Sequence, residues 1–322
     1  MKDIDYAFAV ALIRVNEIKL LTRQDIGALL AAKDYKSCLQ LLADKGWGVG
    51  SDLDEAQMLA AEQKKLWALI EEAAPQSGLF EALYYKNDFH NVKAAIECLV
   101  SDLPIEKYMI SPSVFSHEVV STAIKNKQYE LLGDELGEVA CEAYRIMLET
   151  GDSQLMEAIV DKASIELTVK KARECKMPLL ENLLGFEALC ATLKTAMRCA
   201  ATKKELAFNL KAIADIAELD REGLSKAALS GVQGVLDYVG DHGFDEATEQ
   251  LKISLSAFEK WAENKRMSMV QHGKLEAFGE APLIGYILAR EAEIKNVRII
   301  LSGHRSGISQ EKISERLREL YV

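Results

Sequence analysis

Apolar residues recur every three or four positions along nearly the whole chain, a spacing that places them on one face of successive α-helices. In residues 6–21, for example, Phe8, Leu12 and Val15 fall on one side, and Arg14 interrupts them. No alternating β-branched run is bounded by turn residues, and the 322 residues include only five prolines. The sequence therefore predicts an all-α fold with a strand content near zero.

The charge balance argues against nucleic-acid and lipid binding. Asp and Glu number 50 against 39 Lys and Arg, so the formal net charge is −11, whereas proteins that bind phosphate-rich surfaces present basic ones. The first residues lack a basic segment followed by an apolar core, and no uncharged run approaches the roughly 18 residues of a membrane span. We therefore expect a cytoplasmic protein with no nucleic-acid partner and no direct lipid anchor.

A short pattern recurs at a long period. It consists of a polar residue, an aliphatic residue and a cation, and its copies lie roughly 100 residues apart. The polar and cationic positions of the three copies are Asn91 and Lys93, Thr192 and Lys194, and Asn296 and Arg298. The period predicts three similar helical domains, 1–108, 109–215 and 216–322, and the third could pack with the N-terminal helix.

The cations of this pattern allow two interpretations. Two helical positions separated by one residue point about 200° apart, so the polar residue and the cation address different neighbours. The cations could simply belong to a solvated face. Alternatively, Lys93, Lys194 and Arg298 could each pair with a carboxylate on another helix of the same domain.

The sequence offers no convincing site for chemistry. The glycines at 46–50 lack the spacing of a dinucleotide loop, and acids at the following helix start would repel phosphate. No phosphate-binding P-loop motif occurs, and Ser116, His117 and Glu118 are consecutive, so they cannot form a catalytic relay. Histidines and cysteines lack the spacing of metal ligands. We predict no catalytic residue, no cofactor and no metal.

The C-terminal region predicts two helices. Pro282 lies near the start of a long apolar helix that Gly303 is expected to end. Ser309 is then expected to cap a short helix. The apolar face of that short helix would consist of Ile313, Leu317 and Leu320.

Four segments resemble one known family. Residues 281–303, with the closing run 316–322, are similar to the C-terminal signature of the C subunit of the V-type (archaeal-type) ATP synthase, the counterpart of the d subunit of the vacuolar ATPase. Residues 85–93 resemble the first-domain motif of this family, and residues 6–21 its opening helix. Thr192 departs from the asparagine that is usual at its position.

The resemblance implies a fold and a function. Members of this family are all-helical funnels of three similar domains about a pseudo-threefold axis. They are non-catalytic central-stalk subunits that link the rotor shaft to the membrane rotor ring and transmit torque between ATP hydrolysis or synthesis and proton or sodium transport. The resemblance therefore implies rotor shaft subunits and the membrane rotor ring as partners, a location on the cytoplasmic face of the membrane through the complex, and a monomer when isolated.

Two other classes remain open at this point. A free-standing helical-repeat scaffold protein would account for the long period, though not for the C-terminal run. A helical enzyme whose site is assembled from distant residues would also fit the composition.

Overall fold

The computed structural model describes residues 6–48, 54–73 and 80–321. Every regular element in this part of the chain is helical, and the extended backbone amounts to one isolated bridge between Ile216 and Leu219. The predicted all-α fold is thus confirmed. None of the described helices combines the length and the apolar character that crossing a membrane requires.

The chain divides into two compact units. The first, unit 1, combines residues 1–77 with residues 259–322, and the second, unit 2, comprises residues 78–258. The two ends of the chain therefore fold together, with the middle forming a unit of its own. The predicted three-domain division remains a prediction.

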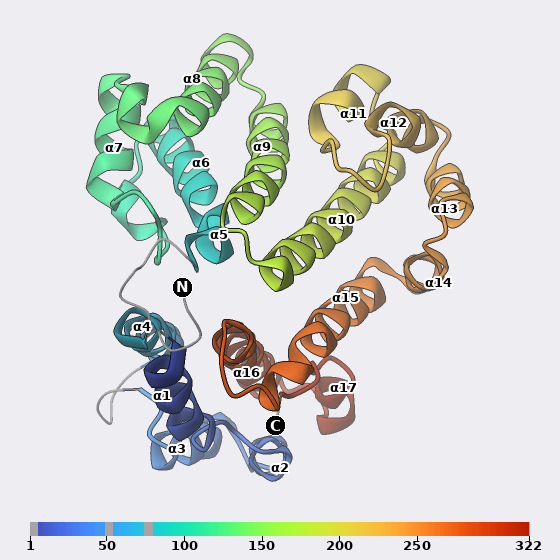
Figure 1. Ribbon diagram of the computed structural model, residues 1–322. Coiled ribbons are helices and arrows are strands. Elements are labelled where there is room, and N and C mark those ends of the chain that lie inside the picture. The colour runs from blue at the N-terminus through green and yellow to red at the C-terminus, as the bar shows by residue number, and fades with distance from the viewer. Residues whose placement is uncertain (1–5, 49–53, 74–79, 322) are drawn as a thin grey trace. The chain divides into compact units, whose positions relative to one another are not determined.

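Unit 1 is built around one long C-terminal helix, α16, which packs against three N-terminal helices, α1, α3 and α4 (Figure 1). The short α17 contacts both α16 and α2. The helix α15 starts in unit 2 and continues into unit 1. The helices of unit 1 are α1 (Ala7–Glu17), α2 (Arg23–Leu30), α3 (Tyr35–Asp44), α4 (Glu55–Ala73), α15 (Leu255–Val270), η5 (Gln271–Lys274), α16 (Ala281–Arg305) and α17 (Gln310–Ser314).

Apolar side chains from both chain ends form the core of unit 1. On α16, Val297, Ile300 and Leu301 are fully buried, and they meet Leu42 of α3 and Leu29 of α2 in one cluster. Burying a side chain of this size contributes about 1.5 to 3 kcal/mol. This core cannot be completed by either end of the chain alone.

Unit 2 contains two groups of packed helices. In the first, α6 lies against α7, α8 and α9, and in the second, α10 lies against α11, α12 and α13 (Figure 1). The antiparallel pair α9 and α10 connects the two groups. The helices of unit 2 are α5 (Glu81–Tyr84), α6 (Lys86–Ser101), η3 (Ile105–Lys107), α7 (His117–Asn126), η4 (Tyr129–Leu132), α8 (Gly133–Thr150), α9 (Ser153–Glu174), α10 (Pro178–Ala201), α11 (Leu206–Ala212), α12 (Arg221–Leu229), α13 (Val232–Asp241) and α14 (Asp245–Ile253).

The expected end of the long C-terminal helix was wrong. α16 continues past Gly303 to Arg305, and the glycine with a left-handed backbone is Gly307, at φ +63°. Gly303 instead gives α17 room to approach, because a Cβ at this position would lie 2.5 Å from Cδ1 of Ile313.

The short helix that follows is also shorter than expected. α17 ends at Ser314, and Ser309 makes no side-chain cap hydrogen bond. Leu317 and Leu320 lie beyond the helix but still pack, partly buried, against the core of unit 1, and Ile313 is fully buried there. The apolar set was therefore identified correctly, although one helix does not carry all of it.

We expect the variant Gly303→Ala to lower the free energy of unfolding by about 1 to 3 kcal/mol, because the new methyl group must displace a buried, branched side chain. Gly27→Ala is the matched control: Gly27 is exposed within α2, and no atom lies within 4 Å of the place that its methyl group would take. That change should instead stabilise by roughly 0.5 to 1 kcal/mol through helix propensity. Urea unfolding of both variants measures the difference, and equal effects would contradict the close approach of α17.

Candidate functional site

The three copies of the repeated pattern lie on the three long helices α6, α10 and α16. The structure does not bring them together in one site. Each helix carries its polar residue toward buried surroundings, since Asn91, Thr192 and Asn296 are at most 1% exposed. The three side chains are therefore buried inside the protein, and their contacts differ.

The two asparagines hold a passing backbone segment in the same way. In unit 2, the Asn91 amide donates to the Ile110 carbonyl at 3.0 Å, and its Oδ1 accepts from the Ile110 N–H at 2.8 Å. In unit 1, the Asn296 amide donates to the Arg318 carbonyl at 3.0 Å, and its Oδ1 accepts from the Arg318 N–H at 2.8 Å. We call this two-bond contact an amide clamp. Each clamp fixes the segment that follows its helix.

Thr192 makes no such clamp. Its hydroxyl is buried, and among the described residues it has no hydrogen-bond partner. A threonine side chain ends in a single hydroxyl, whereas the clamp uses an amide nitrogen and an amide oxygen to bind the C=O and N–H of one residue. The departure from asparagine seen in the sequence therefore has a structural consequence.

The repeated cations differ from one another. Lys93 on α6 forms an ion pair with Asp161 on α9 at 2.5 Å. Lys194 is half-buried and lines a groove between α9 and α10. Arg298 is exposed, and in the described part of the chain it forms no ion pair; its neighbour Lys295 contacts Glu263 on α15 instead. Lys93 thus forms an ion pair with another helix, although Asp161 belongs to the second predicted domain and Lys93 to the first, and Arg298 lies on a solvated face.

We expect Asn91→Ala and Asn296→Ala each to lower the free energy of unfolding by about 1 to 3 kcal/mol, since each removes two hydrogen bonds to the backbone of one partly buried residue. Thr192→Val should do the opposite and stabilise by up to about 1 kcal/mol, because it removes a buried hydroxyl without a partner. Denaturant unfolding of the three variants provides the test. A loss at Thr192→Val as large as at the asparagines would show that the hydroxyl is hydrogen-bonded after all.

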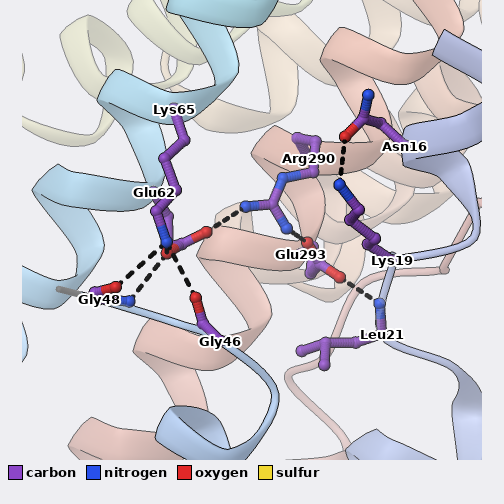
Figure 2. A network of polar contacts seen from close by, with 9 residues as sticks. All are labelled: Asn16, Lys19, Leu21, Gly46, Gly48, Glu62, Lys65, Arg290 and Glu293. Atoms are coloured by element: carbon purple, nitrogen blue, oxygen red, sulfur yellow. Dashed lines mark hydrogen bonds and ion pairs between the residues drawn. The ribbon is translucent and has the colours of Figure 1, made fainter. Parts of the chain in front are cut away.

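A cluster of buried charges lies in unit 1, around Arg290 of α16 (Figure 2). Arg290 is 7% exposed and lies between Glu62 of α4, 3% exposed, and Glu293 of α16, 2% exposed. Its Nη2 donates to Glu62 Oε2 at 2.6 Å, and its Nη1 donates to Glu293 Oε2. The Trp47 ring lies 5.2 Å from the guanidinium as a cation–π partner.

Both carboxylates also bind groups from other N-terminal segments. Glu293 accepts a hydrogen bond from the backbone N–H of Leu21, directly before α2 (Figure 2). Glu62 accepts from the backbone N–H of Gly48 at 2.9 Å and from Lys65 at 2.7 Å. Lys65 in turn donates to the Gly46 carbonyl at 2.9 Å. We refer to Arg290, Glu62 and Glu293 with these partners as the arginine network.

The arginine network gives the glycine-rich segment a structural role. Gly46 and Gly48 adopt left-handed backbone conformations, at φ +81° and +77°, which favour glycine. Gly50 lies outside the described residues. The backbone N–H of Gly48 donates to the Glu62 carboxylate, so this glycine segment packs against α4.

In the arginine network, burial disfavours the charged form of Glu293, whereas its ion pair and hydrogen bond favour that form. Burial raises the pKa of Glu293 above its ordinary value, and the Arg290 charge and the Leu21 N–H oppose that rise. Burial likewise raises the pKa of the nearby Tyr286 to about 12. Two carboxylates around one guanidinium are held without water only when each remains hydrogen-bonded. The arrangement therefore ties N-terminal segments to α16.

Sequence reasoning missed this network. Arg290 and Glu293 are three residues apart inside an apolar helix, and this was the one available signal. Glu62 lies 228 residues from Arg290, and nothing in its surroundings distinguishes it from an exposed helical glutamate.

We expect Arg290→Met to lower the free energy of unfolding at neutral pH by about 3 to 5 kcal/mol, because it leaves the buried Glu293 carboxylate without a cation and Glu62 with Lys65 alone. Without the guanidinium, burial favours the protonated form of Glu293 in the folded state. The folded state then binds more protons than the unfolded chain, so the variant should regain stability as the pH falls from about 7.5 toward about 5.5.

Urea unfolding of wild type and variant at both pH values measures this effect. Adding Glu62→Gln and Glu293→Gln to Arg290→Met should restore part of the stability and remove the additional pH response. If Arg290→Met lowered the free energy of unfolding by the same amount at both pH values, the assignment of buried, charged carboxylates would be contradicted.

Comparison with known proteins places this sequence in a family. The sequence matches the model of the family described as ATP synthase (C/AC39) subunit over residues 9–316. The C subunit of the V-type sodium ATPase of Enterococcus hirae is 23% identical, with 96% of this chain and 97% of that protein covered. The C subunit of the A-type ATP synthase of Methanocaldococcus jannaschii is 22% identical, with 97% and 86% covered. The C subunit of the V-type ATP synthase of Thermus thermophilus is 24% identical, with 73% and 72% covered.

The match of this all-helical chain to these proteins defines a subunit of a rotary ATPase. The chain belongs to the ATP synthase (C/AC39) subunit family. The resemblance inferred from the sequence is confirmed.

Proposed function

We propose that this chain is a non-catalytic central-stalk subunit of a rotary V/A-type ATPase. It links the rotor shaft to the membrane rotor ring and transmits torque between ATP hydrolysis or synthesis and proton or sodium transport. The observation that carries this proposal is the family match over residues 9–316, together with relatives named as the C subunit of such complexes that align over both ends of the chain.

The packing of unit 1 supports a role in carrying torque. An adaptor between a shaft and a ring must not yield between its attachment points, and close-packed interiors transmit strain. In unit 1, the apolar core and the arginine network both connect the N-terminal helices to α16. Opening this unit would expose the core and separate buried charges at the same time.

The proposal extends to the domain organisation. Three similar helical domains about a pseudo-threefold axis, forming a funnel, would account for the three long helices that carry the repeated pattern. The matching amide clamps on α6 and α16 support it, since two unrelated helices would not be expected to share the same two-bond contact.

The charge of the chain suggests how it is attached. We propose the rotor shaft subunits and the membrane rotor ring as partners, on the cytoplasmic face of the membrane. A net charge of −11 disfavours direct contact with anionic lipid. Attachment would therefore run through protein surfaces, and the isolated chain would be a monomer.

We expect removal of residues 308–322 to uncouple the complex. The deletion takes away the buried Ile313, and it removes Arg318 from its clamp with Asn296 and from its ion pair with Glu263 at 2.6 Å. Loss of these contacts should destabilise unit 1 by several kcal/mol, on the order of a large core truncation. ATP-driven ion transport should fall to background, while the soluble head continues to hydrolyse ATP.

The measurement is ion transport in membrane vesicles from cells that lack the full-length chain, complemented with either form. Full-length complementation is the control, and urea unfolding of the isolated truncated chain shows whether unit 1 is weakened. Transport at the normal rate with the truncated chain would show that this segment is dispensable for coupling.

A further inference from the structure

A second polar position recurs beside the amide clamps. Three residues before the clamp asparagine, α6 carries Asp88 and α16 carries Glu293, and these side chains lie in residues only 0% and 2% exposed. Asp88 accepts hydrogen bonds from the backbone N–H groups of Val114 and Phe115, at 3.0 and 2.9 Å, in the segment that follows α6. Glu293 accepts one from the backbone N–H of Leu21. These two helices therefore hold irregular backbone through a buried acid as well as a buried amide.

The middle copy of the pattern, on α10, lacks both groups. Leu189 stands at the position of the acid, and Thr192, at the position of the asparagine, has a buried hydroxyl without a partner among the described residues. The irregular segment after α11 is held from α9 instead, where Glu166 accepts from the Asp215 N–H at 2.7 Å. That bond is exposed to water, whereas the two bonds of Asp88 are partly buried. The polar ties of α10 are thus weaker than those of α6.

The helices α10, α11 and α12, which pack on one another, also bury polar groups with unmet hydrogen-bonding capacity (Figure 1). Asn209 of α11 is 0% exposed, and its amide nitrogen donates to the Ser225 carbonyl of α12 at 3.3 Å. Within the described ranges, neither Oδ1 of Asn209 nor the fully buried hydroxyl of Ser225 has a partner. A buried polar group without a partner destabilises the folded state, because its hydration is lost and not replaced. Opening these helices returns that hydration.

The lengths of the helices add to this effect. α11 has 7 residues and α12 has 9, and helices this short depend on packing for their stability. Proteins open locally in cooperative groups of elements, and a group with poorer stabilising contacts opens at a lower cost.

We propose that α10, α11 and α12 form the part of unit 2 that opens first: these helices unfold locally while α6, α7 and α8 remain folded. The buried acid and the amide clamp of α6 keep the first group closed, and α10 has neither. Such opening is a property of the chain itself, whatever complex the chain joins.

Native-state hydrogen exchange of the full chain, followed by mass spectrometry, tests this proposal. After correction for intrinsic rates, the amides of α10, α11 and α12 should exchange at least about tenfold faster than those of α6 and α8, because their opening does not require the first group to unfold. Their exchange should also depend less on low concentrations of urea, since a local opening exposes less surface than global unfolding.

Two matched threonine variants on α10 test the physical cause. Thr192→Val removes a buried hydroxyl without a partner and should slow exchange of α10, α11 and α12 by about twofold to fivefold. Thr195→Val makes the same change one turn away, but this hydroxyl donates to the Ala191 carbonyl at 3.1 Å, so exchange should not become slower. Adding Ser225→Ala to Thr192→Val should slow exchange further. Thermal unfolding verifies that the variants are folded.

Two outcomes would overturn the proposal. The first is exchange of α10, α11 and α12 at the same rates and with the same urea dependence as α6 and α8, which would mean that both groups open together. The second is equal slowing by Thr192→Val and Thr195→Val, which would show that the hydroxyl without a partner is not what lowers the stability of this group.

Discussion

Unit 1 depends on one guanidinium held between two buried carboxylates. The Arg290–Glu62 contact joins residues 228 positions apart, and Glu293 adds the backbone of Leu21 to the same centre. Apolar contacts are tolerant of small shifts, but charges removed from water are stable only in the arrangement that pairs all of them. The arginine network therefore selects one register for α4, the segment before α2, and α16. The apolar core of unit 1 supplies most of the buried surface that stabilises this arrangement.

The amide clamps serve a similar purpose on a smaller scale. Asn91 and Asn296 each bind the backbone N–H and C=O of one residue, so an irregular segment is fixed without a strand or helix partner. A buried peptide group must find such partners wherever the chain leaves regular structure. The clamps allow unit 1 and unit 2 to keep non-helical segments against their long helices.

Much of the fold could be predicted from the sequence because its signals are local. The apolar period indicated the helices, and Thr22 with Asp25 forms a complete capping box. The repeated polar positions were also recognised, although their role as clamps requires partners roughly 20 residues away that the pattern does not reveal. What was missed depends on distant contacts: Gly303 was interpreted as a helix end, because only the packed Ile313 shows why a side chain is excluded there.

The discontinuous make-up of unit 1 has a consequence for biosynthesis. Its first helices leave the ribosome before unit 2, but α16, which they pack against, is made only after all of unit 2. Unit 2 is continuous and can fold as soon as it emerges. The apolar faces of α2 and α3 must meanwhile remain exposed or be shielded by chaperones. Synthesis of the final helices thus acts as the step that allows unit 1 to reach its native state.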